Sequence, residues 1–357
     1  MRGSILSRYL MREAAEAWIA VTVVLLAIMI GTRFASVLGI AAKGELPRDL
    51  LVDVAMLSTV RYLVILIPAS LLLAIMLSLG RLYADSEIAA MTGCGVGFGR
   101  LCRPFLWLAA MLAVVTGALA FSFGPWAGRQ ADYLLKDAKR LVQYTPFEAG
   151  QFRTVAGGRA VFYTDSMSPA GDRFGRVFAQ IDEARGASVV VADHGQQSID
   201  PASGDRAVQL FDGYRYYGLP GAADYDVMQF HQLTLRLSPP PFAYINNQRV
   251  LSPTLALAGS ADPQDQAELQ ARLAAPLSVL ILALLAVPLS HLRPREGRYG
   301  KLVIGILAYL AYINLISFGQ TWIAKGRIPP AIGLWWVHGL VLLVAVWLIA
   351  RRQAMVR

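Results

Sequence analysis

Glycines crowd one polar stretch of the chain and raise the question of a nucleotide-binding loop. Residues 93–99 read GCGVGFG between two long apolar runs. A dinucleotide fingerprint needs G-x-G-x-x-G after a strand. Counted from Gly93 the sixth residue is Phe98, and counted from Gly95 it is Arg100. The pattern therefore fails, and we expect no nucleotide site and no cofactor in this chain.

Histidines, cysteines and carboxylates form no catalytic or metal-binding spacing either. The sequence contains four histidines and two cysteines, which are His194, His231, His291, His338, Cys94 and Cys102. None of them belongs to an HExxH motif, a Cys-rich cluster or a nucleophile motif. We therefore expect no metal site and no catalytic residues, and we regard both thiols as structural. A membrane enzyme is accordingly the least favoured class of function.

Composition points instead to a membrane protein. Hydrophobic residues make up 56% of the 357 residues and charged residues only 16%, against about 25% charged in soluble domains. A helix needs about 20 apolar residues to cross the hydrocarbon. Six segments qualify: 17–38, 54–79, 103–124, 273–292, 302–323 and 331–350.

The basic residues beside these spans predict their orientation. Short loops on one side carry Arg2, Arg8, Arg12, Arg81, Arg100, Arg103, Arg293, Arg295, Arg298, Lys301, Arg351, Arg352 and Arg357. Short loops on the other side carry only Lys43, Arg48, Lys325 and Arg327. Because cytoplasmic loops are the basic ones, both termini are expected in the cytoplasm. This topogenic charge explains the net charge of +9 without any binding of nucleic acid.

The long segment outside the membrane has the pattern of an antiparallel β domain. Short runs rich in Val, Phe, Tyr and Thr alternate with turn residues, and they lie at 159–164, 176–182, 187–193, 206–212 and 226–237. Apolar residues change parity within the last run, which suggests a bulge. A closed barrel, a sandwich and an open jelly roll all fit this periodicity.

The resulting layout is three spans, one inserted β domain and three further spans. We place the first membrane half at 1–124, the β domain at 125–268 and the second membrane half at 269–357. A polar helix at 262–275 is expected to run into the fourth span.

The polar stretch 81–103 predicts a short surface helix at about 86–92. Asp85 and Ser86 suit its N-cap, and Glu87 in the first turn favours the helix dipole. Apolar residues such as Ile88 and Met91 follow before the glycines. Such a helix can dock into a soluble partner, or it can be an ordinary solvated connection.

Two arginines lie inside the expected spans. Arg33 is 16 residues beyond Ala17, which is about 24 Å at a rise of about 1.5 Å per residue. An arginine at this depth either faces a cavity and binds phosphate or extends to the outer headgroups. Arg61 lies nearly at the outer boundary, where the second interpretation is favoured.

Several motifs resemble the LptF/LptG family of lipopolysaccharide export permeases of Gram-negative bacteria. They are RYLMRE at 8–13, LGRLYADSEIAAMTGCG at 79–95, GPW at 124–126, GQF at 150–152, SVVVADHG at 188–195 and VPLSHLRPREGR at 287–298. They cover both membrane halves and the β domain in the family's order. The second and the last motif favour the LptF branch of the family.

The resemblance implies a fold, partners and an activity. The fold is an α-helical inner-membrane protein of six transmembrane helices with an inserted periplasmic β-jellyroll. The partners are an LptG-type permease, a cytoplasmic LptB-type ATPase dimer that binds the ATP, and an LptC-type single-span jellyroll protein. Together they extract lipopolysaccharide from the inner membrane and pass it to a periplasmic bridge.

The resemblance also implies site residues. Residues 86–92 match the coupling helix that docks into the ATPase, which assigns this role to Asp85, Ser86, Glu87, Ile88 and Met91. Arg33 matches the basic residues of the first span that meet lipid phosphates. Relatives place a second basic residue nearby, where this chain has Met29-Ile30-Gly31-Thr32, so Lys43 is assigned as its substitute.

Two other classes of function compete with this interpretation. A secondary transporter needs paired intramembrane charges or broken helices in repeated halves, whereas Asp53 is the one acidic residue near Arg33 and Arg61 in the spans. A passive membrane tether, whose β domain only binds other proteins, would tolerate changes at Glu87.

Overall fold

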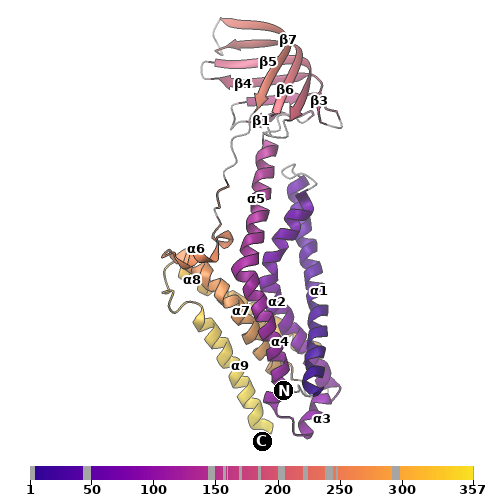
Figure 1. Ribbon diagram of the computed structural model, residues 1–357, viewed down its shortest axis with the longest axis vertical. Coiled ribbons are helices and arrows are strands. Elements are labelled where there is room, and N and C mark those ends of the chain that lie inside the picture. The colour runs from indigo at the N-terminus through magenta and orange to yellow at the C-terminus, as the bar shows by residue number, and fades with distance from the viewer. Residues whose placement is uncertain are drawn as a thin grey trace. The chain divides into compact units, whose positions relative to one another are not determined.

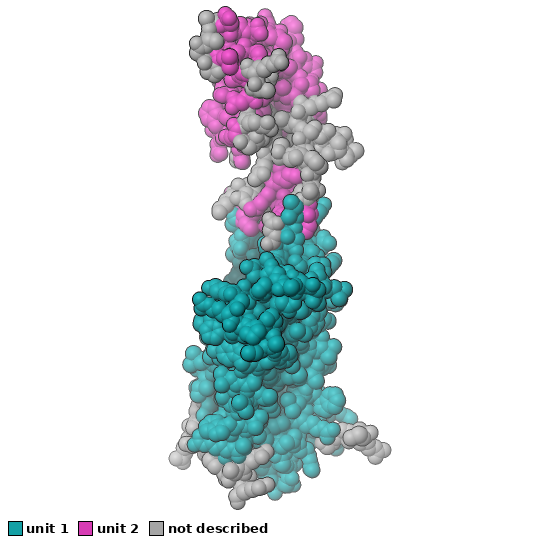
Figure 2. All heavy atoms as spheres, turned by 90° about the vertical axis from the view of Figure 1, so that its left-hand side faces the viewer, with its two compact units in different colours: residues 1–39, 49–133, 245–357 teal, residues 40–48, 134–244 magenta. Residues whose placement is uncertain are grey.

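The computed structural model contains a helical unit and a β unit, whose ribbons are shown in Figure 1. It describes residues 5–42, 50–143, 149–155, 158, 160–168, 171–183, 186–199, 206–219, 224–237, 244–246, 248–291 and 298–356. The first unit comprises residues 1–39, 49–133 and 245–357, and the second comprises residues 40–48 and 134–244 (teal and magenta in Figure 2).

The helical unit is organised around one central helix. Its helices are α1 (Ile5–Ala42), α2 (Leu51–Ala84), α3 (Glu87–Gly93), α4 (Phe98–Ala118), α5 (Gly124–Gln143, whose last part enters the second unit), α6 (Thr254–Ala258), α7 (Pro263–Leu289), α8 (Arg298–Ala324) and α9 (Trp335–Val356). α7 packs against α2, α4, α8 and α9. Their shared core includes Leu71, Phe105 and Leu282, all fully buried.

The expected spans coincide with these helices. Five helical segments of the described chain are long and apolar enough to cross a membrane: Ile5–Ala42, Leu51–Ala84, Phe98–Arg140, Pro263–Leu289 and Gly300–Ala324. The sixth expected span, 331–350, overlaps α9, whose apolar stretch Trp335–Arg351 is shorter. A helical membrane protein with an inserted antiparallel β-sheet is therefore confirmed, and the count of six spans stays a prediction.

The helix of the third span continues through Gly124-Pro125 instead of ending there. A π-helical turn, Leu119–Phe123, joins α4 to α5, and the Gly124 amide donates to the Leu119 carbonyl five residues back. A Cβ on Gly124 would lie 2.7 Å from that carbonyl oxygen, so glycine is needed at this position. The second unit contains residues 134–244, and the domain bounds expected at 124/125 and 268/269 stay a prediction.

Proline at position 125 leaves one helix carbonyl without its usual donor. In a regular helix the Pro125 nitrogen would serve the Phe121 oxygen, but proline has no N–H. The Thr254 hydroxyl donates a 2.6 Å hydrogen bond to the Phe121 oxygen instead. Buried Arg272 in turn donates to the hydroxyl of half-buried Thr254 at 2.7 Å and pairs with buried Glu268 at 3.0 Å. The start of α6 is thus attached to the π-helical turn and to α7.

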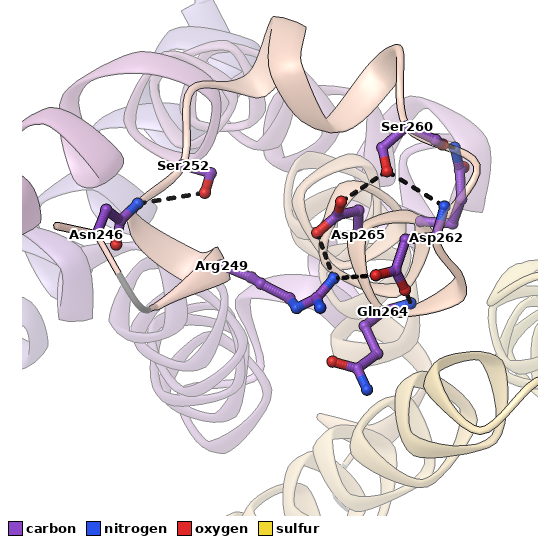
Figure 3. A network of polar contacts seen from close by, with 8 residues as sticks. Asn246, Arg249, Ser252, Ser260, Asp262, Gln264 and Asp265 are labelled. Atoms are coloured by element: carbon purple, nitrogen blue, oxygen red, sulfur yellow. Dashed lines mark hydrogen bonds and ion pairs between the residues drawn. The ribbon is translucent and has the colours of Figure 1, made fainter.

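The segment before α7 is attached by a second group of polar contacts (Figure 3). Arg249, in the 3-10 turn Arg249–Leu251, lies 2.8 Å from Asp262 and 2.7 Å from Asp265. The Asp262 side chain also caps α7 by accepting from the Gln264 amide at 2.9 Å. The polar helix expected at 262–275 is therefore confirmed as the first half of α7.

The β unit is one antiparallel sheet built of consecutive hairpins. Its strands are β1 (Arg153–Val155), β2 (Ala160–Thr164), β3 (Arg173–Phe174), β4 (Val177–Glu183), β5 (Gly186–Ile199), β6 (Arg206–Gly218) and β7 (Tyr225–Leu237). The order is β1-β2-β4-β5-β6-β7, and β3 pairs with β5. One face is buried around Phe162, Val208 and Leu210. All five expected strands are present, and β5 and β6 extend further than expected.

β3 and β4 are two parts of one interrupted strand. Arg173 pairs with Gln196 and Val177 pairs with Ala192, which is the same register against β5. Gly175 interrupts them, and a Cβ there would collide with the side chains of Asp165 and Ser166.

The bulge expected within 226–237 is wrong. Phe211 pairs with Gln232 and Gly213 pairs with Phe230, so no extra residue enters either strand. Asp212 instead has a positive φ of 48°, which interrupts the pairing at this one position. The change of parity in β7 therefore reflects a local bend without a change of register.

We predict that Thr254→Val destabilises the helical unit by about 1–3 kcal/mol, because the Phe121 oxygen loses its donor inside the protein. Thr254→Ser keeps the hydroxyl and serves as the control. Thermal unfolding of the purified chain in detergent measures the difference. Equal stability of the valine and serine variants would contradict the role of this hydrogen bond.

We further predict that the contribution of Asp262 to stability depends on pH. The Gln264 amide and then Arg249 hold the pKa of the Asp262 carboxyl below its usual value. The ionised Asp262 carboxylate, whose pKa is lowered in the folded state, stabilises the fold at neutral pH. This stabilisation is lost as the carboxylate becomes protonated below about pH 4. The gap in melting temperature between wild type and Asp262→Asn should therefore shrink on acidification. A gap that stays constant with pH would contradict this assignment.

Candidate functional site

The short helix α3 begins with a backbone turn and not with side-chain caps. α2 ends at Ala84, and the amides of Asp85 and Ser86 donate to the carbonyls of Arg81 and Tyr83. Ser86 occupies the N-cap position with a left-handed φ of 62°, and its side chain makes no capping hydrogen bond. The expected capping role of Ser86 is therefore wrong. Asp85 is the C-cap of α2, and both side chains are exposed.

Apolar side chains attach α3 to the core of the helical unit. Ile88 is 4% exposed and belongs to the same buried cluster as Leu79, Leu82 and Leu101. Met91 is half-buried and packs against this cluster. These two residues, expected to belong to the coupling site, therefore face their own chain and hold the helix in position.

Glu87 links α3 to α1 through a polar cluster. The Tyr9 hydroxyl donates a 2.9 Å hydrogen bond to the Glu87 carboxylate. Arg81 donates to the Tyr9 hydroxyl at 3.3 Å and forms a 2.9 Å ion pair with Glu13. We call Tyr9, Glu13, Arg81 and Glu87 the α1–α3 cluster. It joins residues from α1, α2 and α3.

The opposite face of α3 is exposed. Ala89, Ala90, Thr92 and Gly93 point away from the core, and Cys94 follows them as an exposed free thiol. The small alanines leave the helix backbone accessible. The face available to a partner therefore consists of small residues flanked by the Glu87 carboxylate and the Cys94 thiol.

Arg33 lies on α1 away from this cluster. Its side chain is half-buried, and its Nε is buried without a hydrogen-bond partner in the described chain. An arginine with an unsatisfied N–H group can bind an anionic ligand. Lys43, expected as the second cation, lies outside the described residues. Arg61 is exposed on α2.

Sequence reasoning missed the partners of Glu87. Tyr9 and Glu13 are four residues apart, which places them on one face of α1, but nothing local connects them with Glu87 at a separation of 78 residues. The motif at 8–13 contains both residues. Among the described residues, no group of three or more His, Cys, Asp and Glu could hold a metal ion.

We predict that Ile88→Asp detaches α3, because a buried carboxylate without a partner costs several kcal/mol. Amide hydrogen exchange over residues 87–93 should become faster by at least about tenfold. Ala89→Asp places the same charge on the exposed face and should leave the exchange unchanged. Equal exchange in the two variants would show that Ile88 does not hold the helix.

Comparisons with known proteins identify the family of this chain. The family model described as "Lipopolysaccharide export system permease LptF/LptG" matches residues 8–351. Lipopolysaccharide export system permease protein LptF of Escherichia coli K12 is 29% identical over 345 residues, which cover 96% of this chain and 93% of that protein. The protein of the same name from Shigella flexneri has the same identity and coverage. The chain therefore belongs to the LptF/LptG family of lipopolysaccharide export system permeases.

Proposed function

We propose that this chain is a transmembrane subunit of an ABC-type exporter. It extracts lipopolysaccharide from the inner membrane and passes it to a periplasmic bridge toward the outer membrane. Membership of the permease family supports the substrate. The observation that carries the proposed mechanism is α3, a short helix fixed to the core on one face and exposed on the other.

In this proposal α3 receives the movement of a cytoplasmic LptB-type ATPase dimer. The exposed face around Ala89 and Ala90 docks into the ATPase, and the Glu87 carboxylate meets a basic residue there. Ile88 transmits the displacement to the core of the helical unit. The Tyr9–Glu87 hydrogen bond transmits it directly to α1. Hydrolysis itself belongs to the partner.

α1 suits the part of the protein that moves against the substrate. Only Leu10, Ala14 and Val37 are buried along its 38 residues. A helix this exposed has room for a second subunit, which we propose is an LptG-type permease. Lipopolysaccharide then lies between the two subunits with a phosphate near Arg33, whose buried Nε has no partner among the described residues.

The β unit supports the next step of the proposed pathway. β7 is the last strand of the described sheet and pairs only with β6 there. A strand with a free edge can accept another strand by backbone hydrogen bonds. We propose that an LptC-type jellyroll docks at a sheet edge of this unit and continues the route for the acyl chains. The periplasmic location of this unit follows from the expected orientation.

Copurification and ATP hydrolysis test the coupling. The chain is purified from native membranes into nanodiscs, and the ATPase subunit and its activity are measured with and without lipopolysaccharide. Glu87→Arg should remove the bound ATPase or reduce hydrolysis by about tenfold or more, as expected for the loss of a charged contact.

Tyr9→Phe is the matched control for this experiment. It removes the internal hydrogen bond to Glu87 but keeps the carboxylate available to the partner. ATPase binding should therefore persist in Tyr9→Phe. If no ATPase copurifies with the wild type, or if Glu87→Arg retains full activity, the coupling proposal fails and a passive membrane tether becomes the better account.

A further inference from the structure

An apolar groove lies beside the π-helical turn in the helical unit. It has a volume of about 720 Å³ and is lined by Phe121, Ser122, Phe123, Pro125, Trp126, Arg129, Pro253, Thr254 and Leu255. Phe123 is 58% exposed, Trp126 is 51% exposed and Leu255 is 88% exposed. Aromatic and aliphatic side chains this exposed favour contact with an apolar ligand.

The sequence explains why a groove forms at this place. Pro125 and the π-helical turn interrupt the regular α-helical hydrogen bonding, and Thr254 holds the start of α6 against the Phe121 carbonyl. The 3-10 turn at Arg249–Leu251 also approaches α5 closely, since a Cβ on Gly128 would lie 2.6 Å from the Leu251 side chain. These contacts fix both walls of the groove.

One cation lines this apolar groove. Arg129 donates a 2.7 Å hydrogen bond from Nη1 to the Leu251 carbonyl oxygen. Within the described residues no carboxylate neutralises its charge. The guanidinium carries five N–H donors, and among the described residues only the Leu251 contact is recorded for it, which leaves the other donors for an anion. A phosphate group matches the guanidinium geometry and can accept two of its N–H groups at once.

With the placement and orientation predicted from the sequence, the third span, 103–124, ends beside the groove, which then lies at the outer surface of the inner membrane. Aromatic side chains such as Trp126 are typical of this boundary. A ligand here has an acyl chain on the membrane side and a charged group on the water side. The volume lies within the range of about 300–1,000 Å³ that is typical of small-molecule sites. It suits one phospholipid and is small for lipopolysaccharide with its several acyl chains.

We propose that this groove binds one glycerophospholipid of the surrounding membrane. One acyl chain packs on Phe121, Phe123 and Trp126, and the phosphate binds the free N–H groups of Arg129. The bound lipid fills the wedge between the α4–α5 helix and α6. This site is separate from the proposed coupling and transport steps, and it depends only on the membrane placement of the third span.

Native mass spectrometry of the purified full-length chain, together with any subunits that copurify, tests this proposal. The wild type should retain one glycerophospholipid through mild delipidation. The double variant Trp126→Ala/Arg129→Gln should reduce the retained lipid by about tenfold or more, as expected for the loss of a charged contact and an aromatic wall. Trp126→Ala/Arg129→Lys keeps the charge and should recover part of the binding.

Matched variants on the same helix control for general lipid contact. Trp107 is 62% exposed and Arg100 is exposed near the other end of α4. Trp107→Ala/Arg100→Gln should retain the same lipid as wild type. Thermal unfolding of each variant shows whether the fold is intact.

Photocrosslinking from position 123 identifies the occupant even where a variant folds poorly. A benzoylphenylalanine placed there should capture a glycerophospholipid, and one placed at position 107 should capture much less. Equal lipid retention in Trp126→Ala/Arg129→Gln and in Trp107→Ala/Arg100→Gln would overturn the site. Capture of lipopolysaccharide at position 123, or of no lipid, would overturn the proposed occupant.

Discussion

A helix of seven residues is not stable in water on its own, so the function we propose depends on the burial of Ile88. This side chain inserts into the core of the helical unit and fixes α3 at the end of α2. Met91 adds to the contact, and Glu87 ties the helix to α1 through Tyr9. Force applied to the exposed face therefore reaches two helices through one short element. Without this anchor, a partner that binds α3 would move a loop and leave the membrane helices in place.

In another part of the helical unit, the Phe121 carbonyl needs a hydrogen-bond donor to replace the one that Pro125 lacks. A backbone carbonyl near hydrocarbon must find a hydrogen-bond donor, because few waters reach it. Pro125 removes one such donor, and the hydroxyl of Thr254 replaces it across 133 residues of sequence. Buried Arg272 supports this hydroxyl and is itself neutralised by Glu268. The same geometry leaves the apolar groove beside Arg129. The hydrogen bond that replaces the missing donor of Pro125 and the proposed lipid site therefore belong to the same local structure.

Periodicity and composition were sufficient to predict the long apolar helices and five of the seven described strands, but not the short strands β1 and β3. Both rest on local patterns of apolar residues, which tertiary contacts reinforce. The glycine and proline at 124–125 suggested an end to the third span, but a π-helical turn carries the helix through them. Ser86 suggested a side-chain cap, whereas its backbone takes a left-handed turn. The partnership of Tyr9 with Glu87 had no local signal, because only the fold brings these residues together.

The native thiol of Cys94 offers the most direct measurement of the central claim, that the exposed face of α3 is where the ATPase docks. Cys94 is exposed at the C-terminal end of α3, while Cys102, the other cysteine, is buried. The rate of maleimide labelling is compared between the isolated chain and the chain with its proposed ATPase partner bound. The account predicts that labelling of Cys94 slows by about tenfold or more when the ATPase is bound, as expected for burial in a specific interface. Labelling at the same rate in both states would contradict it.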